Sequence, residues 1–415
     1  MKTADKNEKW LWFTLPAWGH TIPVARLIGL IDVNSNCSHT IYSEKPWADY
    51  FKKNCQEVDI KTYQEDLGLK FEVNKTTYKS GTETLLASLS ELQLMAQDLK
   101  NRDVKITKDY DYIICDVVLL PLVKILLPTN TKILTYQTSL DLPIKIAKKV
   151  VWKYLFSKVG KELYKSAWQT IITTTRRQKL INTLNKNFQL SLNQYTMMHP
   201  DGVPIICLTS IYFQPFSHLI LDTYFIGPLL ERRQNNHKKS KRAYVSLGTM
   251  SVSDNHILKV ITKVLLEKNY QVSVKIPDTD CKAAWLSDER ITAKTFFNQP
   301  QELDEADLFV THAGMNSIDE AIASETPTIC IPQANDQFIV AARVEELGLG
   351  IIADQNVTEK SFADAVKLFE ANKSKLSKNL KAGSEKHLYQ NSDEINRLFD
   401  ELGFNPISSS NKKKK

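Results

Sequence analysis

Short apolar runs alternate with longer helix-type stretches along the first 230 residues of the chain. The apolar runs typical of strands lie at residues 10–17, 39–43, 112–119, 132–136 and 204–209, and helix-type stretches include residues 23–31, 82–100 and 145–185. Strands that alternate with helices pair in a parallel sheet, because each helix crosses back over the sheet before the next strand begins. The pattern therefore predicts a parallel sheet covered by helices.

The same pattern starts again after a charged stretch at residues 231–242. Strand-type runs at 243–247, 271–275, 308–310 and 328–331 alternate with helix-type stretches at 257–268 and 316–324. We expect an α/β protein with two doubly wound, Rossmann-like domains at residues 1–230 and 243–383, joined by a linker at 231–242. Apolar residues at helical spacing predict a terminal helix within 384–404, and a disordered basic tail follows at 405–415.

Length and composition fit ordinary globular domains. At 415 residues and 42% hydrophobic content, the chain can bury a core in each of two domains. The six cysteines lack a Cys-x-x-Cys pair or other ligand spacing, so we expect free thiols in a reducing cytoplasm and no zinc site. No segment reaches the roughly 18 apolar residues of a membrane span. The polar N-terminus does not resemble a signal peptide.

The net charge of +7 is unevenly distributed. Residues 145–179 contain ten Lys or Arg and one acid, Glu162, and five aromatic residues are interleaved with them: Trp152, Tyr154, Phe156, Tyr164 and Trp168. One interpretation is a basic, solvated helix face with its aromatic side chains turned inward. The other is a peripheral contact with anionic lipid or an acidic acceptor. No signature of a nucleic-acid-binding fold accompanies the charge, so we expect no nucleic acid partner.

The apolar run at residues 308–310 ends in a small-residue turn that leads directly into a helix. The turn reads Thr311-His312-Ala313-Gly314, and a second apolar run follows the helix at 328–331. Strand, turn, helix and strand make a βαβ unit, whose first turn directs backbone N–H groups and the positive end of a helix dipole at one point. Such a turn predicts a site for a phosphate or diphosphate.

Three motifs around this turn occur in the order of a known signature. The chain reads FFNQ at 296–299, THAGMNSIDE at 311–320 and PQANDQ at 332–337. These motifs resemble W-x-P-Q, T-H-x-G-x-x-S-x-x-E and P-x-x-x-D-Q of the family 1 UDP-glycosyltransferases. The resemblance is closest to the soluble bacterial branch that acts on macrolides and flavonoids. It implies the GT-B fold, in which two Rossmann-like domains face across a cleft and the terminal helix crosses back onto the first domain.

The resemblance also implies a division of labour between the domains. The N-terminal domain would bind the acceptor and the C-terminal domain the sugar nucleotide. The diphosphate would meet the turn and its facing strand end, Glu320 the ribose hydroxyls, and the last two residues of the signature the hexose hydroxyls. The donor-binding residues would be Ser246, Gly248, Thr249, Phe296, Phe297, Gln299, His312, Gly314, Asn316, Ser317, Glu320, Asp336 and Gln337.

A candidate base follows the first strand of the chain. GHTIP at 19–23 resembles the family's G-H-x-x-P, whose histidine is the general base. A neutral imidazole at His20 can remove the proton of an acceptor hydroxyl at pH 7. Asp116, at the end of another apolar run, matches the aspartate that orients this base, although a helix cap is the alternative role. Asp111 and Asp141 are nearby competitors that fit the topology less well.

The signature departs from the family at two positions. Phe296 stands where the family usually has a tryptophan stacked on uracil, and Asn298 replaces the usual proline. Phenylalanine still offers an aromatic face, so we expect sugar-nucleotide binding and leave UDP and thymidine diphosphate both open. No Asp-x-Asp metal motif lies in either strand that borders the cleft. We therefore expect no metal requirement, with the diphosphate charge offset by backbone dipoles and His312.

The sequence thus predicts an inverting glycosyltransferase that moves a hexose, in the first instance glucose, from UDP to a small hydrophobic acceptor. The alternatives are a sugar-nucleotide epimerase or hydrolase on the same fold, and a non-catalytic partner of another glycosyltransferase. We expect no cofactor, and a monomer or weak dimer. An acceptor pocket in the first domain would include Trp18, Met95, Leu140 and Ile144, although core packing explains such residues equally well.

Overall fold

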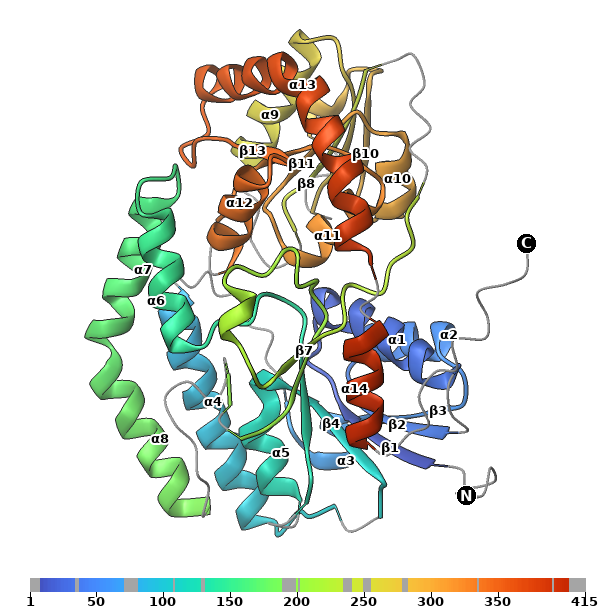
Figure 1. The fold of residues 1–415 in the computed structure, drawn as a ribbon, viewed down its shortest axis with the longest axis vertical. Helices are drawn as coiled ribbons and strands as arrows, with labels where there is room; N and C mark the ends of the chain where they lie inside the picture. Colours follow the sequence, from blue (N-terminus) through green and yellow to red (C-terminus); the bar gives the residue numbers. More distant parts are fainter. Residues whose placement is uncertain are drawn as a thin grey trace.

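The computed structural model describes residues 8–33, 37–70, 81–106, 109–127, 131–188, 199–200, 202–233, 241–248, 255–277, 283–333, 336–389 and 392–402. Figure 1 shows two lobes, one above the other, each built around a twisted sheet with helices packed against it. The two doubly wound α/β domains that the sequence predicts are confirmed.

The N-terminal domain contains a seven-stranded sheet, counted over the described residues, with the order β3-β2-β1-β4-β5-β6-β7. Its strands are β1 (Glu8–Phe13), β2 (Cys37–Ser43), β3 (Val58–Thr62), β4 (Tyr112–Asp116), β5 (Leu134–Gln137), β6 (Ile205–Cys207) and β7 (Thr223–Phe225). Its helices are α1 (Trp18–Asp32), α2 (Trp47–Asn54), α3 (Tyr63–Leu67), α4 (Gly81–Asn101), α5 (Leu120–Leu126), α6 (Ile144–Tyr154), α7 (Gly160–Ile172) and α8 (Thr174–Phe188), with short 3₁₀ turns η1 (Val117–Leu119) and η2 (Ser217–Leu219).

The C-terminal domain contains a six-stranded sheet within the described part of the chain, with the order β10-β9-β8-β11-β12-β13. Its strands are β8 (Arg242–Ser246), β9 (Gln271–Lys275), β10 (Ile291–Lys294), β11 (Leu308–Thr311), β12 (Thr328–Cys330) and β13 (Gly350–Ile352). Its helices are α9 (Asn255–Glu267), α10 (Gln299–Glu305), α11 (Met315–Ala323), α12 (Gln337–Glu346) and α13 (Glu359–His387), with the 3₁₀ turn η4 (Ala284–Leu286).

Each sheet reverses its strand order at one point, and these points define where a ligand can bind. In the N-terminal sheet the reversal lies between β1 and β4, which pair in parallel with Phe13 opposite Cys115. In the C-terminal sheet it lies between β8 and β11, where Thr311 pairs with Ser246. Loops diverge from the carboxyl ends of the strands at such a reversal and leave a crevice between them. The segments with His20 and His312 follow these strand ends.

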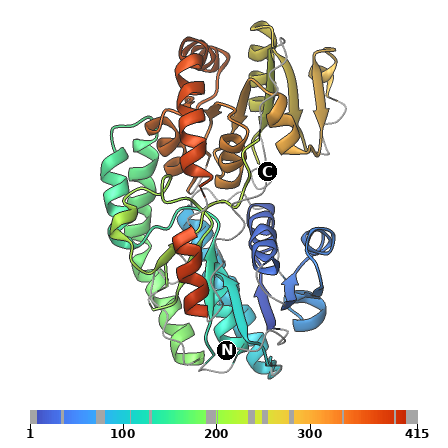
Figure 2. The same cartoon turned by 45° about the vertical axis from the view of Figure 1, so that its right-hand side comes forward.

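The helical stretch predicted at residues 145–185 is three helices, α6, α7 and α8. The chain bends sharply between α6 and α7. At the start of α7, a Cβ atom on Gly160 would lie 1.8 Å from the carbonyl oxygen of Leu155. Only glycine fits so close to the backbone of the preceding turn. The bend brings α6 and α7 side by side, and Figures 1 and 2 show both helices at the edge of the molecule.

The interpretation that the aromatic residues of this basic region turn inward is wrong for four of the five. Tyr154 is buried, but Trp152, Phe156, Tyr164 and Trp168 are all exposed, Phe156 at 97%. The reason lies in the helical period: small or aliphatic residues such as Val150 and Leu163 occupy the inner face.

The end of the chain differs slightly from the predicted terminal helix at 384–404. Residues 384–387 belong to α13, which continues to His387 because Ser384 and His387 are buried against neighbouring elements. A separate helix, α14 (Ser392–Leu402), then packs on the N-terminal sheet, where the Tyr112 hydroxyl donates to the Leu402 carbonyl at 2.6 Å. Figure 1 shows α14 lying over the lower lobe.

One apolar core is shared by both domains. It joins Leu140, Ile146 and Val150 of the N-terminal domain to residues of α11 and α12, including Ile318 and Val340. Polar contacts surround it: the Tyr154 hydroxyl donates to Glu346 at 2.5 Å. Because the shared core is apolar and continuous, it holds the two crevices in a defined relative position.

Candidate active site

The two residues predicted as base and orienting carboxylate lie together at the N-terminal crevice. The Nδ1 atom of His20 is 2.6 Å from the Oδ2 atom of Asp116. His20 lies in the first turn of α1, and Asp116 ends β4 with its other oxygen accepting the backbone N–H of Val118 at 2.9 Å. An ionised carboxylate only accepts hydrogen bonds, so Nδ1 carries the proton and Nε2 is left as the basic atom.

The surroundings of His20 make it a stronger base than an ordinary histidine. Burial alone would lower the pKa of His20, but the charge of Asp116, the hydrogen bond to it and the charge of Asp336 outweigh burial and raise that pKa above 6.5. Asp116 is 1% exposed, whereas His20 is 29% exposed and can meet a ligand. The arrangement can accept a proton from a hydroxyl group.

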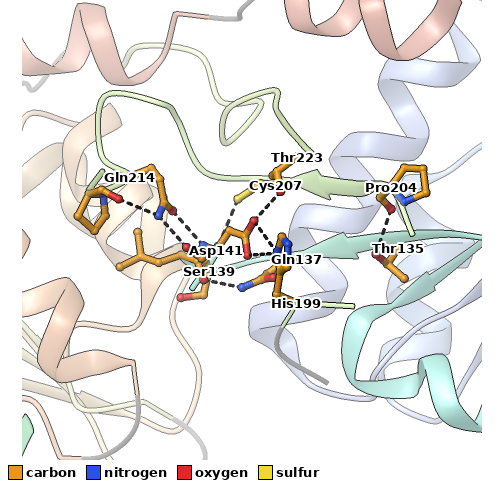
Figure 3. Close-up of polar contacts among 11 residues, drawn as sticks. Thr135, Gln137, Ser139, Asp141, His199, Pro204, Cys207, Gln214 and Thr223 are labelled. Carbon is orange, nitrogen blue, oxygen red and sulfur yellow. Dashed lines mark hydrogen bonds and ion pairs between the residues drawn. The ribbon is translucent and has the colours of Figure 1, made fainter. Parts of the chain in front are cut away.

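The two competing aspartates have other partners. Asp111 is exposed and caps the backbone N–H of Lys9 at 3.0 Å. Asp141 is fully buried and accepts from Thr223 at 2.5 Å, with His199 at 2.9 Å (Figure 3). The side chain of Gln214 bonds both the N–H and the carbonyl of Asp141, so this aspartate fixes the loop between β5 and α6. Asp116 is therefore the carboxylate that orients His20.

The predicted diphosphate turn lies at the C-terminal crevice. Gly314 is the N-cap of α11, and no side chain caps that end of the helix. The first N–H groups of a helix have no partner within it, so those of Asn316 and Ser317 are available to an anion. Ser246 ends the neighbouring strand β8, and Gly248 follows with φ +90°. Thr249 lies outside the described residues.

His312 is held between two glycines. A Cβ atom on Gly314 would lie 2.6 Å from the Nε2 atom of His312, and one on Gly248 would lie 2.9 Å from the same atom. Burial lowers the pKa of His312 to about 4, so its imidazole is neutral at pH 7 and can donate one hydrogen bond. Its Nδ1 atom is buried without a hydrogen-bond partner among the described residues, which is typical of a site that a ligand completes.

Lys275 supplies a positive charge that the sequence motifs did not predict. It ends β9, one residue past the pairing of Val274 with Val245, and so lies level with Ser246 and Thr311 on the adjacent strands. Its charge contributes to the lowering of the His312 pKa. A cation at this position can offset part of a diphosphate charge.

Glu320 is the centre of a hydrogen-bonded group that spans the domains. Its Oε2 atom accepts from Gln299 at 2.8 Å, and its Oε1 atom accepts from Asn316 at 3.1 Å and from Arg26 at 3.0 Å. Gln299 also donates to the Ser317 hydroxyl at 3.2 Å. Arg26 belongs to α1, the helix that carries His20, so the expected ribose-binding carboxylate is held from both domains.

Asp336 connects the two crevices in the same way. It precedes α12, and its carboxylate accepts a hydrogen bond from Ser139, in the loop between β5 and α6. Its charge raises the pKa of His20 and also acts on that of His312. Gln337 points back to its own loop, where it accepts the N–H of Gln333 at 3.0 Å. The Asp336 carboxylate thus lies within electrostatic reach of both histidines.

The two phenylalanines of the signature differ in exposure. Phe296 is 71% exposed, and its ring is open to a stacking partner. Phe297 is buried against Tyr244, with ring centroids 5.6 Å apart, so its role in the structure is to support the donor-side loop.

The residues suggested for an acceptor pocket do not line one common surface among the described side chains. Trp18 is partly exposed at the start of α1, next to Tyr50 with ring centroids 5.7 Å apart. Met95 packs on the core of the N-terminal domain, and Leu140 is buried in the shared core. The side chain of Ile144 is outside the described set. Of these, Trp18 shares the first turn of α1 with His20.

One cluster outside this site has the composition of a metal site. Asp32, Cys37 and His39 lie together, with Asp32 Oδ1 2.8 Å from His39 Nε2. The Nδ1 atom of His39 accepts the indole N–H of Trp12 at 2.9 Å, so the proton of a neutral imidazole is on Nε2. Nε2 donates to Asp32 and has no free lone pair for a metal. The cluster is a buried structural contact.

The chain is similar to known glycosyltransferases. A profile of the glycosyltransferase family 28 C-terminal domain matches residues 255–395. The uncharacterized UDP-glucosyltransferase YojK of Bacillus subtilis is 26% identical over 349 residues, covering 81% of this chain and 83% of that protein. The NDP-glycosyltransferase YjiC of the same organism is 32% identical over 162 residues, covering 37% of this chain and 41% of that protein.

A solved structure has the same fold. The crystal structure of CalG4, the calicheamicin glycosyltransferase, aligns with a TM-score of 0.67 at 17% identity and covers 96% of this chain and 100% of CalG4. The protein is a glycosyltransferase with the GT-B fold. Its sequence relatives include these bacterial UDP- and NDP-glycosyltransferases.

The environment of His20 predicts the pH dependence of the reaction. A base must be neutral, so a raised pKa means that kcat/KM falls with decreasing pH through a value above 6.5. Asp116→Asn removes the charge that raises the pKa of His20. The acid limb of the kcat/KM profile should therefore move to lower pH, and the maximal kcat/KM should fall. His20→Ala should lower kcat by about 10²–10⁴-fold. Asp111→Asn is the matched control and should leave the profile unchanged; an unshifted limb in Asp116→Asn would contradict the assignment.

The packing of His312 between glycines predicts a second result. Gly314 has φ −65°, which alanine adopts freely, so Gly314→Ala acts through the clash of its Cβ with His312 and not through backbone strain. We expect UDP affinity in calorimetry to fall about tenfold or more, roughly 1.4 kcal/mol. Gly29→Ala, on α1, where a Cβ would contact nothing within 4 Å, is the control. Equal UDP affinity in Gly314→Ala and Gly29→Ala would mean that His312 is not part of the donor site.

Proposed function

We propose that the protein transfers a hexose, in the first instance glucose, from a UDP-sugar to a hydroxyl group of a small hydrophobic acceptor. The transfer inverts the anomeric carbon and uses no metal ion. One observation carries the proposal: an oriented histidine of one domain faces a diphosphate turn of the other, with Asp336 acting electrostatically on both His20 and His312. A base and a leaving-group site at one place are what a direct displacement needs.

The proposed reaction begins at His20. Its Nε2 atom takes the proton of the acceptor hydroxyl while the hydroxyl oxygen attacks the anomeric carbon of the donor. The imidazolium that forms is stabilised by Asp116, which keeps Nδ1–H bonded and the ring oriented. The bond between the anomeric carbon and the diphosphate oxygen breaks on the opposite face, so one displacement inverts the configuration. Two successive displacements would require an enzyme nucleophile, and none is invoked.

Departure of the diphosphate is assisted by the C-terminal crevice. The N–H groups at the start of α11 and the positive end of its dipole meet the charge that develops on the leaving oxygen. Lys275 and one N–H of His312 add to this stabilisation. We propose that these groups take the role that a divalent ion has in metal-dependent enzymes. Binding of the anion would also raise the pKa of His312 from about 4, because negative charge favours the imidazolium.

Donor recognition would use the residues already held in place. Glu320 can accept both ribose hydroxyls, because each carboxylate oxygen accepts more than one hydrogen bond. Asp336 and Gln337 would receive the hexose hydroxyls, and Phe296 would stack on the base. The relatives support this donor class, since one is named a UDP-glucosyltransferase and another an NDP-glycosyltransferase. The name of CalG4, a calicheamicin glycosyltransferase, supports a small-molecule acceptor.

The alternatives explain less of the structure. An epimerase or hydrolase needs no base directed at an acceptor hydroxyl, whereas His20 and Asp116 are 2.6 Å apart and His20 lies within electrostatic reach of Asp336 of the other domain. A non-catalytic partner would not need to preserve that pair, the uncapped helix end and the flanking glycines together. The acceptor transfer is therefore the function that accounts for all these features.

Direct assay tests the proposal. Purified protein would be incubated with UDP-glucose or dTDP-glucose and with polyphenol, macrolide and sterol acceptors, and products would be identified by mass spectrometry. We expect a gain of one hexose on an acceptor, undiminished in EDTA, with an inverted anomeric configuration by NMR. Release of free glucose without acceptor dependence would favour a hydrolase. Activity lost in EDTA and restored specifically by Mg²⁺ or Mn²⁺ would contradict the metal-free mechanism.

The exposed ring of Phe296 predicts the basis of donor preference. Stacking of an aromatic ring on a nucleobase contributes about 1–3 kcal/mol, so Phe296→Ala should weaken UDP binding by about one to two orders of magnitude. Affinity for ribose 5-phosphate, which lacks the base, should stay unchanged. Leu368→Ala, another exposed apolar side chain of the C-terminal domain, is the control. Equal losses for both ligands would mean that Phe296 does not stack on the base.

A further inference from the structure

The outer face of α6 and α7 is the most unusual surface of the described molecule. Five of the thirteen large apolar side chains that are exposed in the described chain lie on these helices and the turn between them: Trp152, Phe156, Tyr164, Trp168 and Ile172. Trp152 is 75% exposed and Trp168 54%, whereas Trp10 and Trp12 are fully buried. Exposed apolar side chains that gather on one surface are typical of an interaction site.

Helical spacing gathers these residues on one side of each helix. On α6, Lys148 and Trp152 lie four residues apart, and Phe156 follows in the turn after the helix. On α7, Tyr164, Trp168 and Ile172 follow an i, i+4, i+8 stripe. The opposite sides of both helices, with Val150 and Leu163 among them, pack into the shared core against α12. The outer sides therefore face away from the C-terminal domain, at the edge that Figures 1 and 2 show.

Basic residues surround the apolar ones. The exposed lysines of this surface are Lys145, Lys148, Lys149, Lys161 and Lys165, and Arg176 and Lys179 continue the charge onto α8. Glu162 is the one acid of residues 145–179, and it pairs with Lys165 at 3.7 Å. No ion pair to a described residue is recorded for Lys145, Lys148 or Lys161. The surface is thus strongly positive around an aromatic centre.

We propose that this surface, the α6–α7 face, docks the protein peripherally on anionic phospholipid. Tryptophan and tyrosine prefer the boundary between headgroups and acyl chains, where one part of the ring is apolar and another polar. Lysines beside them are attracted to the negative surface potential of anionic lipid. An amphipathic face with both features is what binds in the plane of a membrane interface.

The positive charge of the α6–α7 face favours anionic lipid over a second copy of the chain as its partner. A second copy docked on this face by a two-fold axis would bring two positive surfaces together, which costs free energy. The contact with lipid is also peripheral, because no helix in the described residues is long and apolar enough to cross a membrane. The face lies beside the catalytic crevice, since α6 follows directly after the loop whose Ser139 contacts Asp336.

Vesicle co-sedimentation tests the proposal. The full chain would be incubated with phosphatidylcholine vesicles that contain or lack phosphatidylglycerol, at low and high salt. We expect binding that requires phosphatidylglycerol, weakens at high salt and shifts the tryptophan emission to shorter wavelength as Trp152 and Trp168 leave water. Equal binding to both vesicle types, or none to either, would overturn the proposal.

Two pairs of variants locate the contact. The double variant Lys148→Gln/Lys149→Gln should lower the partition coefficient for vesicles about tenfold or more. The matched control changes two exposed lysines of α13, Lys375→Gln/Lys378→Gln, and should leave that coefficient within about twofold. Trp152→Ser with Trp168→Ser should abolish the emission shift, with Leu221→Ser as the exposed apolar control. Unchanged UDP affinity and thermal unfolding show that each variant is folded.

Outcomes that favour another occupant are distinct. A wild-type dimer in analytical ultracentrifugation that becomes monomeric in the tryptophan variant would assign the face to a second copy and overturn the proposal. If the α6 and the α13 lysine variants lost vesicle binding equally, the binding would depend on net charge alone. That result would also overturn the proposal. The assay measures binding alone, so its failure leaves the proposed transfer reaction unaffected.

Discussion

The packing of α6 and α7 against α12 is the interaction on which the rest of the structure depends. These helices contribute Ile146, Val150 and Leu163 to one apolar core with Val340 and its neighbours from the other domain. Burial of shared apolar surface is favourable without being directional, so it fixes how far apart the domains lie, and polar pairs such as Tyr154 with Glu346 fix their register. The two crevices face each other because of this core.

Two residues of the N-terminal domain use that placement to hold donor-side carboxylates. Arg26 contacts Glu320 at 3.0 Å, and Ser139 donates to Asp336. Both carboxylates belong to the C-terminal domain and are proposed to bind the sugar nucleotide. The loop that carries Ser139 is itself fixed by the buried Asp141 and its hydrogen bonds to Thr223 and Gln214. A donor site held from both sides loses less conformational freedom when it binds its ligand.

The same site is organised around charge. His20 is made more basic by Asp116 and Asp336, while His312 is kept neutral by burial between two glycines. Two histidines with pKa values moved in opposite directions suit opposite tasks: one accepts a proton and the other donates a hydrogen bond. Lys275 and the start of α11 supply the positive potential for an anion.

The sequence by itself determined the two-domain α/β fold and the βαβ turn at Gly314, because each follows from strand ends and local motifs. The partner of His20 was expected only from the family resemblance, and the structure decided it as Asp116. The sequence did not determine that residues 145–185 bend into separate helices, since the bend depends on the close approach of Gly160 to the backbone of Leu155. Nor did it reveal the contacts of Arg26 and Ser139, which join positions 294 and 197 residues away in the chain. Such contacts have no local signature. Only the tertiary structure decided which aromatic residues of the basic region face water, because burial depends on what α12 covers.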